Sequence, residues 1–422
     1  MVYEGKTKEE LSALLEKERK AYEEIKLRGI NLDVSRGKPA PEQLDISAEL
    51  LNTPINGFSE SGIDCRNYGV LDGIPEIKNL FAELLDIKPS EIFVGGNSSL
   101  NLMYDLIMKF MIFGTGEGAA PWKDAEEIKF LCPSPGYDRH FAITENFGFK
   151  MIPVTMTPQG PDMDEVERLV SSDSSIKGIW CVPMYSNPQG ISYGDETVRR
   201  FAALKPAASD FRIFWDNAYF VHHLTDTTDS ILNILEECKK TGREDSVFIF
   251  ASTSKISFPG AGISVMASSE KNIAYLTRLI GAQTIGYDKI NQLRHAAFFK
   301  SAADVHNHMK RHRDIMYPKF LIIEKSLDEG LLAEGLITYH KPNGGYFISV
   351  DTTLASAKRV VKLCLEAGLK LTPAGSSYPY HIDPNDSNIR LAPTFIGEES
   401  LSEFGELFSC AVRISSLEKL LG

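Results

Sequence analysis

The sequence lacks any stretch approaching the roughly 18 continuous apolar residues that suggest a membrane span. Residues 1–26, MVYEGKTKEELSALLEKERKAYEEIK, are charged and helical in period, and they lack the apolar core of a signal peptide. Low-complexity tracts and internal repeats are also missing. We therefore expect a folded protein in the cytoplasm, without membrane partners.

Cysteine is scarce and scattered, and no two cysteines form the C-x-x-C pair that metal or redox sites use. We expect reduced thiols at Cys65, Cys132, Cys181, Cys238, Cys364 and Cys410. An excess of positive charge is missing too, since the formal net charge is -12. Nucleic acids and anionic membranes attract clustered Lys and Arg, so neither is an expected partner. An anionic ligand would need a local basic pocket.

At 422 residues the chain is too long for one ordinary core, and two domains are expected. Between residues 46 and 300, short apolar runs alternate with helical patterns, which is typical of an α/β fold around a mainly parallel sheet. Seven strands are expected: EIFVGG, IKFLCPS, FKMIPVTM, IKGIWCVPMY, FRIFWD, SVFIFAS and ISVMAS. Residues 301–422, with residues 1–45, would form a smaller α+β domain. A first helix is expected from Thr7 to about Leu27, with Thr7 and Glu10 as a capping box and Gly29 beyond its end.

Three polar clusters follow predicted strands, and ligands of open α/β sheets sit outside the carboxyl ends of strands. They contain Asn187, Asp216 with Tyr219, and Ser252 with Lys255. A partly desolvated lysine can form a Schiff base. A buried carboxylate such as Asp216 can keep a pyridine nitrogen protonated, while Tyr219 and Asn187 can bond to a phenolate oxygen on the same ring. Taken singly, these residues can also be a solvated lysine, turn residues and a core tyrosine.

A fourth cluster, Gly95-Gly96-Asn97-Ser98-Ser99, lies between a predicted strand and the helical pattern LNLMYDLIMKFMIF. Its amides and hydroxyls can hold a phosphate at a helix amino terminus. An ordinary helix cap gives the same pattern.

Several motifs occur in the order found in the pyridoxal-phosphate aminotransferases of fold type I, which the chain resembles over nearly its whole length. They are Tyr68 ahead of Gly73-Ile74-Pro75-Glu76, Ser98-Ser99, Tyr137, Asn187-Pro188-Gln189-Gly190, Asp216 to Tyr219, Lys255 and Arg390. The segments SRGKP, GGNSSLNLM, CPSPGYDRH and YDKINQLRH are similar to the bacterial aspartate aminotransferase subgroup Ic, also described as MocR-like.

The resemblance implies that pyridoxal 5'-phosphate is the cofactor and that Lys255 binds it as a Schiff base. Asp216 would pair with the pyridine nitrogen, and Asn187 and Tyr219 would contact the ring oxygen. Tyr137 would stack on the ring face.

The resemblance also implies a shared phosphate site, in which Tyr68 reaches the cofactor of the other subunit of a homodimer. Further phosphate-holding positions match Ser98, Ser99 and Ser252. One departure is clear, because Gly262 and Ile263 stand where the family's phosphate-pairing arginine is expected.

In YDKINQLRH, Lys289 or Arg294 could balance the phosphate charge, although both can also be solvated helix residues.

For the substrate, the resemblance implies that Arg390 grips the alpha-carboxylate and that Gly37 contributes a backbone contact near it. A second cation is needed for the side-chain carboxylate of aspartate or glutamate, and the sequence offers Arg139 and Arg36. We favour Arg139. A helix cap or a local ion pair would explain the same residue.

The expected reaction moves the amino group of aspartate or glutamate to 2-oxoglutarate or oxaloacetate. Three alternatives stay open: an aromatic or other neutral amino donor, another reaction on the same cofactor, and a non-catalytic sensor domain. The first 45 residues hold too little structure for a DNA-binding winged helix.

Histidines at 306, 308 and 312 have partly the spacing of a zinc site, but no third ligand is identifiable. We expect no metal and interpret this tract as a basic, solvated helix face. His222 and His223 are expected to serve packing or an interface.

Overall fold

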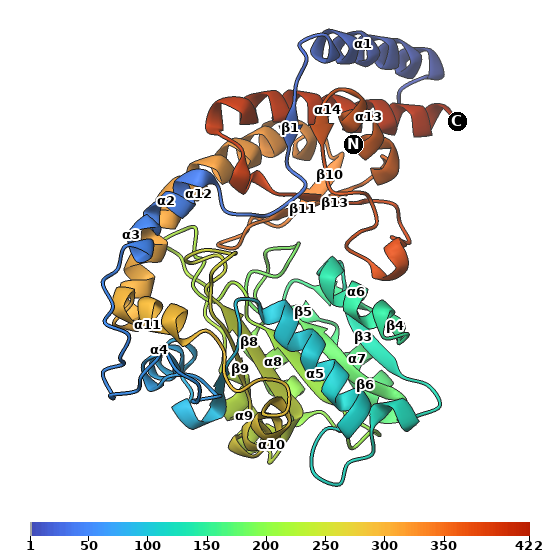
Figure 1. Ribbon diagram of the computed structural model, residues 1–422. Coiled ribbons are helices and arrows are strands. Elements are labelled where there is room, and N and C mark those ends of the chain that lie inside the picture. The colour runs from blue at the N-terminus through green and yellow to red at the C-terminus, as the bar shows by residue number, and fades with distance from the viewer. Residues whose placement is uncertain (1) are drawn as a thin grey trace.

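A computed structural model describes residues 2–422 and contains one large sheet with helices on both faces (Figure 1). Its strand order is β2-β9-β8-β7-β6-β3-β4-β5. The strands are β2 (Ile92–Val94), β3 (Lys129–Ser134), β4 (Lys150–Thr157), β5 (Gly160–Pro161), β6 (Ile176–Cys181), β7 (Arg212–Asp216), β8 (Val247–Ser252) and β9 (Ser264–Ala267). Strands β4, β3, β6, β7 and β8 are mutually parallel, whereas β9 runs antiparallel to β8 and β2.

All seven predicted strands are present, which confirms the mainly parallel sheet. The eighth, β5, has two residues and pairs antiparallel with β4 at the edge of the sheet. Such a short pairing has no periodicity from which it could be predicted, and Pro161 lacks the amide hydrogen that a central strand needs.

Strand alternation separates two apolar layers on opposite faces of the sheet. Phe214 and Phe248 belong to one cluster, together with side chains of α5 (Ser99–Phe113), α6 (Asp138–Asn146) and α10 (Glu270–Ile280). Their strand neighbours Ile213 and Ile249 belong to the other, with α4 (Pro75–Leu85), α7 (Met163–Ser172), α8 (Asp195–Ala203) and α9 (Ile234–Lys240). The covered faces leave the strand ends as the place for a ligand site.

The carboxyl-terminal part of the chain forms a second, three-stranded antiparallel sheet of order β10-β11-β13. Its strands are β10 (Ile337–Tyr339), β11 (Ile348–Thr352) and β13 (Asn388–Leu391). The helices of this part are α12 (Ala302–Leu327), α13 (Ala357–Glu366) and α14 (Glu398–Leu421). The remaining regular elements are β1 (Leu32–Asp33), β12 (Leu369–Lys370), α2 (Pro41–Ile46), α3 (Ala48–Leu51) and α11 (Lys289–Phe298).

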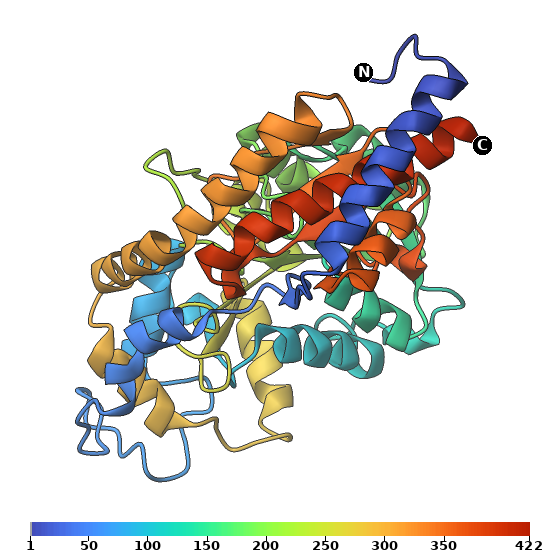
Figure 2. The same cartoon turned by 90° about the horizontal axis from the view of Figure 1, so that it is seen from above.

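The first helix, α1 (Lys8–Lys26), lies beside α14 although the two are far apart in sequence (Figure 2). Arg19 pairs with Glu418 at 3.0 Å across this contact. The capping box of Thr7 and Glu10 is present, and Gly29 has a φ of 70°. These local predictions are therefore confirmed.

The expectation of a solvated face at His308 and His312 was wrong. Both are buried on α12, and their Nε2 atoms lie 3.2 Å apart. Gln43 lies 3.1 Å from His312 Nδ1, and the His308 Nε2 lies 2.9 Å from the carbonyl oxygen of Ile256. Apolar neighbours at helical spacing, such as Met316, carry this face of α12 into the core. Only His306 is exposed as predicted.

Within residues 2–422 the structure contains no cluster of three or more His, Cys, Asp or Glu side chains suited to a metal ion. No helix in this range is long and apolar enough to cross a membrane. All six cysteines are free and buried, which agrees with the expectation of reduced thiols.

Candidate active site

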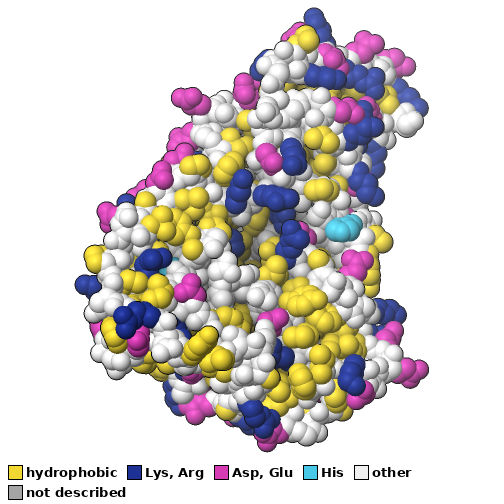
Figure 3. Space-filling model, in the orientation of Figure 1, with side chains coloured by type: hydrophobic (Ala, Val, Ile, Leu, Met, Phe, Trp, Pro, Cys, Tyr) yellow, Lys and Arg dark blue, Asp and Glu magenta, His cyan; other side chains and the backbone are white. Residues whose placement is uncertain are grey.

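The carboxyl ends of three adjacent parallel strands bring together the residues predicted from separate motifs. Asp216 ends β7, Asn187 lies in the loop after β6, and Lys255 follows β8. Asp216 and Asn187 are each only 3% exposed. On the surface, Lys and Arg side chains gather around a hollow between the large sheet and the carboxyl-terminal part (Figure 3). The sheet topology therefore assembles one polar site inside a protein of negative net charge.

Asp216 is held through one of its two carboxylate oxygens. His140 Nε2 donates to Asp216 Oδ2 at 3.0 Å, and the imidazole stacks on Trp180 with ring centroids 4.4 Å apart. The other oxygen, Oδ1, is buried and has no hydrogen-bond partner within residues 2–422. A buried acceptor without a donor is costly, so this oxygen fits a ligand that brings an N–H group.

Lys255 lies close to the same carboxylate. Burial lowers the pKa of its amine, while the nearby Asp216 charge opposes that shift. Its Nζ lies 4.8 Å from the centre of the Tyr219 ring. Burial raises the pKa of Tyr219, which keeps the phenol protonated as a donor. A lysine amine with a lowered pKa is a better nucleophile at neutral pH.

Tyr137 is the residue before α6, and its ring lies 4.9 Å from the His140 ring in an edge-on arrangement. Burial raises its pKa, and the charge of Asp216 adds to the shift. The aromatic side chain therefore lies near the Asp216 carboxylate, and its stacking on a cofactor ring stays a prediction.

Arg390 comes from β13 and is 9% exposed. Its Nη1 donates to Asp138 Oδ1 at 3.1 Å and to Asn187 Oδ1 at 3.3 Å. Its Cζ lies 5.0 Å from the ring centre of Phe347, and its Nε is buried without a partner in the described chain. A Cβ at Gly37 would lie 2.4 Å from Phe347 Cζ, so only glycine lets this ring lie where it supports Arg390.

The three serines predicted for phosphate lie after β2 and at the end of β8, two strands that are separated in the sheet by β9. Ser98 precedes α5, but its side chain makes no capping hydrogen bond. The hydroxyl of Ser98 therefore does not act as a helix cap. Ser99 is partly buried and Ser252 is buried. The hydroxyl of Ser98 and the amino end of α5 remain available to an anion.

The two candidate replacements for the missing arginine lie on α11, which contacts the loop after Lys255. Asn291 Nδ2 donates to the carbonyl oxygens of Ala261 and Gly262, each at 3.0 Å. Lys289 is buried at the start of α11, and Arg294 has a buried Nε without a partner in residues 2–422.

Three other predicted residues are exposed. Tyr68 is 82% exposed, and Arg36 and Arg139 are also on the surface. Neither guanidinium takes part in an ion pair within the described chain. The structure thus brings Lys255, Asp216, Asn187, Tyr219 and Arg390 together but gives no internal partner to these surface side chains.

Sequence reasoning missed His140 and Asp138. Both stand in CPSPGYDRH, directly after Tyr137, but their partners Asp216 and Arg390 are 76 and 252 residues away in sequence. The one available signal was proximity in sequence, since His140 stands in the first turn of α6, three residues after Tyr137.

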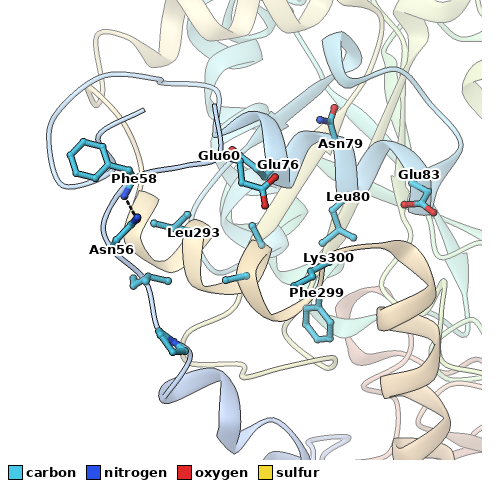
Figure 4. Close-up of a pocket in the computed structure, with 14 residues that line it drawn as sticks. Asn56, Phe58, Glu60, Glu76, Asn79, Leu80, Glu83, Leu293, Phe299 and Lys300 are labelled. Carbon is cyan, nitrogen blue, oxygen red and sulfur yellow. Dashed lines mark hydrogen bonds between the residues drawn. The ribbon is translucent and has the colours of Figure 1, made fainter. Parts of the chain in front are cut away.

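A cavity of about 810 Å³ lies elsewhere, between α4, α11 and the segment 54–60 (Figure 4). Leu80, Leu293 and Phe299 line it together with Glu60 and Glu76. None of the residues of the polar site lines this cavity, so its size says nothing about the chemistry at the strand ends.

A buried carboxylate, a lysine with a lowered pKa and a buried arginine near the carboxyl ends of a mainly parallel sheet are typical of pyridoxal-phosphate-dependent transferases. The family model described as aspartate amino-transferase matches residues 6–422. The chain belongs to this family.

Similar proteins agree with that assignment. An aspartate aminotransferase of Corynebacterium glutamicum is 44% identical over 385 residues, covering 91% of this chain and 89% of that protein. A crystal structure of an aspartate transaminase from the same organism superposes with a TM-score of 0.95 at 42% identity and covers 97% of each chain. LysN, an alpha-aminoadipate aminotransferase of Thermus thermophilus, shares the fold with a TM-score of 0.74 at 19% identity over 95% of each chain.

Proposed function

We propose that this protein is a pyridoxal-phosphate-dependent aminotransferase that moves the amino group of aspartate or glutamate to 2-oxoglutarate or oxaloacetate. The observation that carries the proposal is the proximity of Asp216 and Lys255. One carboxylate oxygen is buried without a donor, and beside it lies an amine whose pKa is lowered by burial. Family membership and the similarity to a transaminase of C. glutamicum support the same reaction.

The residues present fit the cofactor. Asp216 Oδ1 would accept a hydrogen bond from the protonated ring nitrogen, and His140 would hold the carboxylate in place through Oδ2. Because Asn187 Oδ1 accepts from Arg390, its amide group is left to donate to the ring oxygen, and Tyr219 is a second donor. Tyr137 would cover the ring face. When bound, pyridoxal phosphate supplies an electron sink for negative charge at the substrate alpha-carbon.

Lys255 is proposed both to attach the cofactor and to move the proton. Once the substrate amine has replaced it, the Nζ amine is free near the reacting carbon. Its lowered pKa keeps a larger fraction of the amine unprotonated and ready to take the alpha-proton. The same atom would return this proton on the cofactor side within the same half of the exchange, and the second half would run the transfer in reverse.

Substrate binding is proposed to rest on cations of different accessibility. Arg390 is buried and would take the alpha-carboxylate, with the backbone at Gly37 close to it. Arg139 is exposed and has no ion-pair partner in the described chain, so it is the favoured residue for the side-chain carboxylate, with Arg36 as the second choice.

The proposed unit is a homodimer in which Tyr68 contributes to the phosphate site of the partner subunit. Tyr68 is 82% exposed in its own protomer, which supports a contact of its side chain with the partner subunit. Lys289 or Arg294 would complement Ser98, Ser99 and Ser252 at the phosphate. Six free, buried thiols suit a reducing cytoplasmic compartment.

We further propose a large domain of residues 46–300 and a small domain of residues 1–45 with 301–422. Under this division the cofactor residues come from the large domain, whereas Gly37 and Arg390 come from the small one. The substrate would therefore bind between them.

The test is to incubate the purified protein with pyridoxal phosphate and a panel of amino donors, and to record the cofactor absorbance and the 2-oxo products. Aspartate or glutamate should give amino transfer, and Lys255→Ala should abolish it. Turnover with aromatic donors alone would support the neutral-donor alternative. Bound cofactor without any turnover would support a sensor domain.

A further inference from the structure

Asp138 places a carboxylate next to Arg390, where the carboxylate of a substrate is expected to bind. It is the first residue of α6, and its side chain is 29% exposed. Its Oδ1 lies 3.1 Å from Nη1 of Arg390, the arginine proposed to hold the substrate alpha-carboxylate. The pair joins α6 to β13, two elements that are 252 residues apart in sequence. The arginine is therefore already paired inside the protein.

The pairing uses only one part of the guanidinium. Nη1 has two acceptors, Asp138 Oδ1 and Asn187 Oδ1, and Phe347 covers one face of the group. Nε is buried and has no partner in the described chain. A carboxylate can bind the edge formed by Nε and Nη2 in the bidentate geometry that arginine favours. Asp138 and a substrate carboxylate can thus occupy different edges at the same time.

Two physical effects follow. The hydrogen bond fixes the plane of a side chain that otherwise has several rotatable bonds, and orientation of this kind is a large part of catalysis. The negative charge, on the other hand, repels a bound carboxylate across the guanidinium. For charges about 7 Å apart at an effective dielectric constant of about 20 to 40, this repulsion weakens binding by roughly 7- to 55-fold.

We propose that Asp138 is a positioning residue that orients Arg390 by its hydrogen bond. Its negative charge also lowers the affinity of Arg390 for carboxylates. The inference rests on the proposed function, because it assumes that Arg390 binds the alpha-carboxylate. A site that binds an amino acid and must release a 2-oxo acid gains from a carboxylate affinity that is limited in this way.

The two effects can be separated with two variants of the cofactor-loaded protein. D138N keeps an oxygen acceptor for Nη1 but removes the charge, whereas D138A removes both. The control D195N changes another first-turn aspartate, which begins α8 and pairs with Arg199 at 3.4 Å on the surface. Maleate, a dicarboxylate without an amino group, serves as the probe. Its Kd is measured by titration of the cofactor absorbance, together with kcat and KM for aspartate and the melting temperature.

We expect D138N to bind maleate roughly 7- to 55-fold more tightly and to lower the KM for aspartate. D138A should lose kcat by at least about tenfold relative to D138N, since orientation is lost as well. D195N should leave all three quantities as in the wild type.

An unchanged or weaker maleate affinity in D138N would overturn the proposal, and so would variants that only lower the melting temperature. If the wild type itself fails to transaminate, the proposed function fails instead, and the two failures are therefore distinguishable.

Discussion

Replacing Gly37 with alanine tests whether substrate binding depends on a packing contact outside the polar site. A Cβ at this position would lie 2.4 Å from Cζ and 2.7 Å from Cε1 of Phe347. Carbon atoms in ordinary contact are about 3.5 to 4.0 Å apart, so the ring must recede by about 1 Å. Phe347 supports the guanidinium of Arg390, which lies 5.0 Å from its ring centre. The displacement therefore reaches the side chain proposed to orient the substrate.

The structure sets the size of both expected effects. Forcing a methyl group against a packed ring costs about 1 to 3 kcal/mol of unfolding free energy. A shift of about 1 Å in a positioning group can cost roughly 10- to 100-fold in kcat/KM. Because Gly37 does not have a positive φ, the alanine backbone itself adds no strain.

Steady-state kinetics with aspartate and thermal unfolding of the same preparation measure the two effects. Gly116→Ala is the matched control, because a Cβ there meets nothing within 4 Å. A Gly37→Ala variant with wild-type kcat/KM and a lowered melting temperature would refute the link from Phe347 to Arg390. A variant equal to the control in both measurements would refute the packing argument itself.

Further substitutions test individual groups. Asp216→Asn should lower kcat at least about 100-fold in the aspartate assay, because a neutral amide no longer stabilises a protonated ring nitrogen. Arg390→Lys should raise the KM for aspartate at least about tenfold, since lysine cannot bind a carboxylate in bidentate fashion. Arg139→Ala should lower kcat/KM for dicarboxylic amino donors more than for the monocarboxylic donor alanine. An equal loss of kcat/KM for both classes would contradict the assignment of Arg139. Burial lowers the pKa of His312 to about 3. Between pH 6.5 and 3 the unfolded chain therefore binds more protons at this residue than the folded chain does. As a result, the free energy of unfolding falls with decreasing pH by up to about 1.4 kcal/mol per pH unit. Urea unfolding of His312→Gln should show a shallower decline than that of the exposed His306→Gln.

The large sheet could be predicted because its strands are buried apolar runs between helical patterns. Lys129–Ser134 and Val247–Ser252 show this clearly, since all but one of their residues are buried. The short strands could not be predicted. β10 and β13 have three and four residues, and they owe their pairing to β11 rather than to their own periodicity. Buried His308 and His312 were misjudged because their polar partners, such as Gln43, come from a distant segment.

Those residues of the polar site whose position follows from the order of the strands could be predicted. Asp216 and Lys255 follow adjacent parallel strands, and residues in such positions meet at one edge of the sheet. His140 and Asp138 were not predictable in this way, because each acts through a side chain from another part of the chain. Pairwise contacts over such separations leave no trace in local spacing.

The location of Arg390, the arginine proposed to bind the substrate, suggests how an acidic protein can bind an acidic ligand. A net charge of -12 repels dicarboxylates at long range, so binding has to come from cations gathered at one place. Figure 3 shows such a gathering around the hollow above the sheet. Yet Arg390, the most buried of the cations proposed to bind substrate, is already bonded to Asp138. If orientation alone were needed, a neutral acceptor such as Asn187 would suffice, so the charge of Asp138 is best explained as a limit on how tightly carboxylates are held.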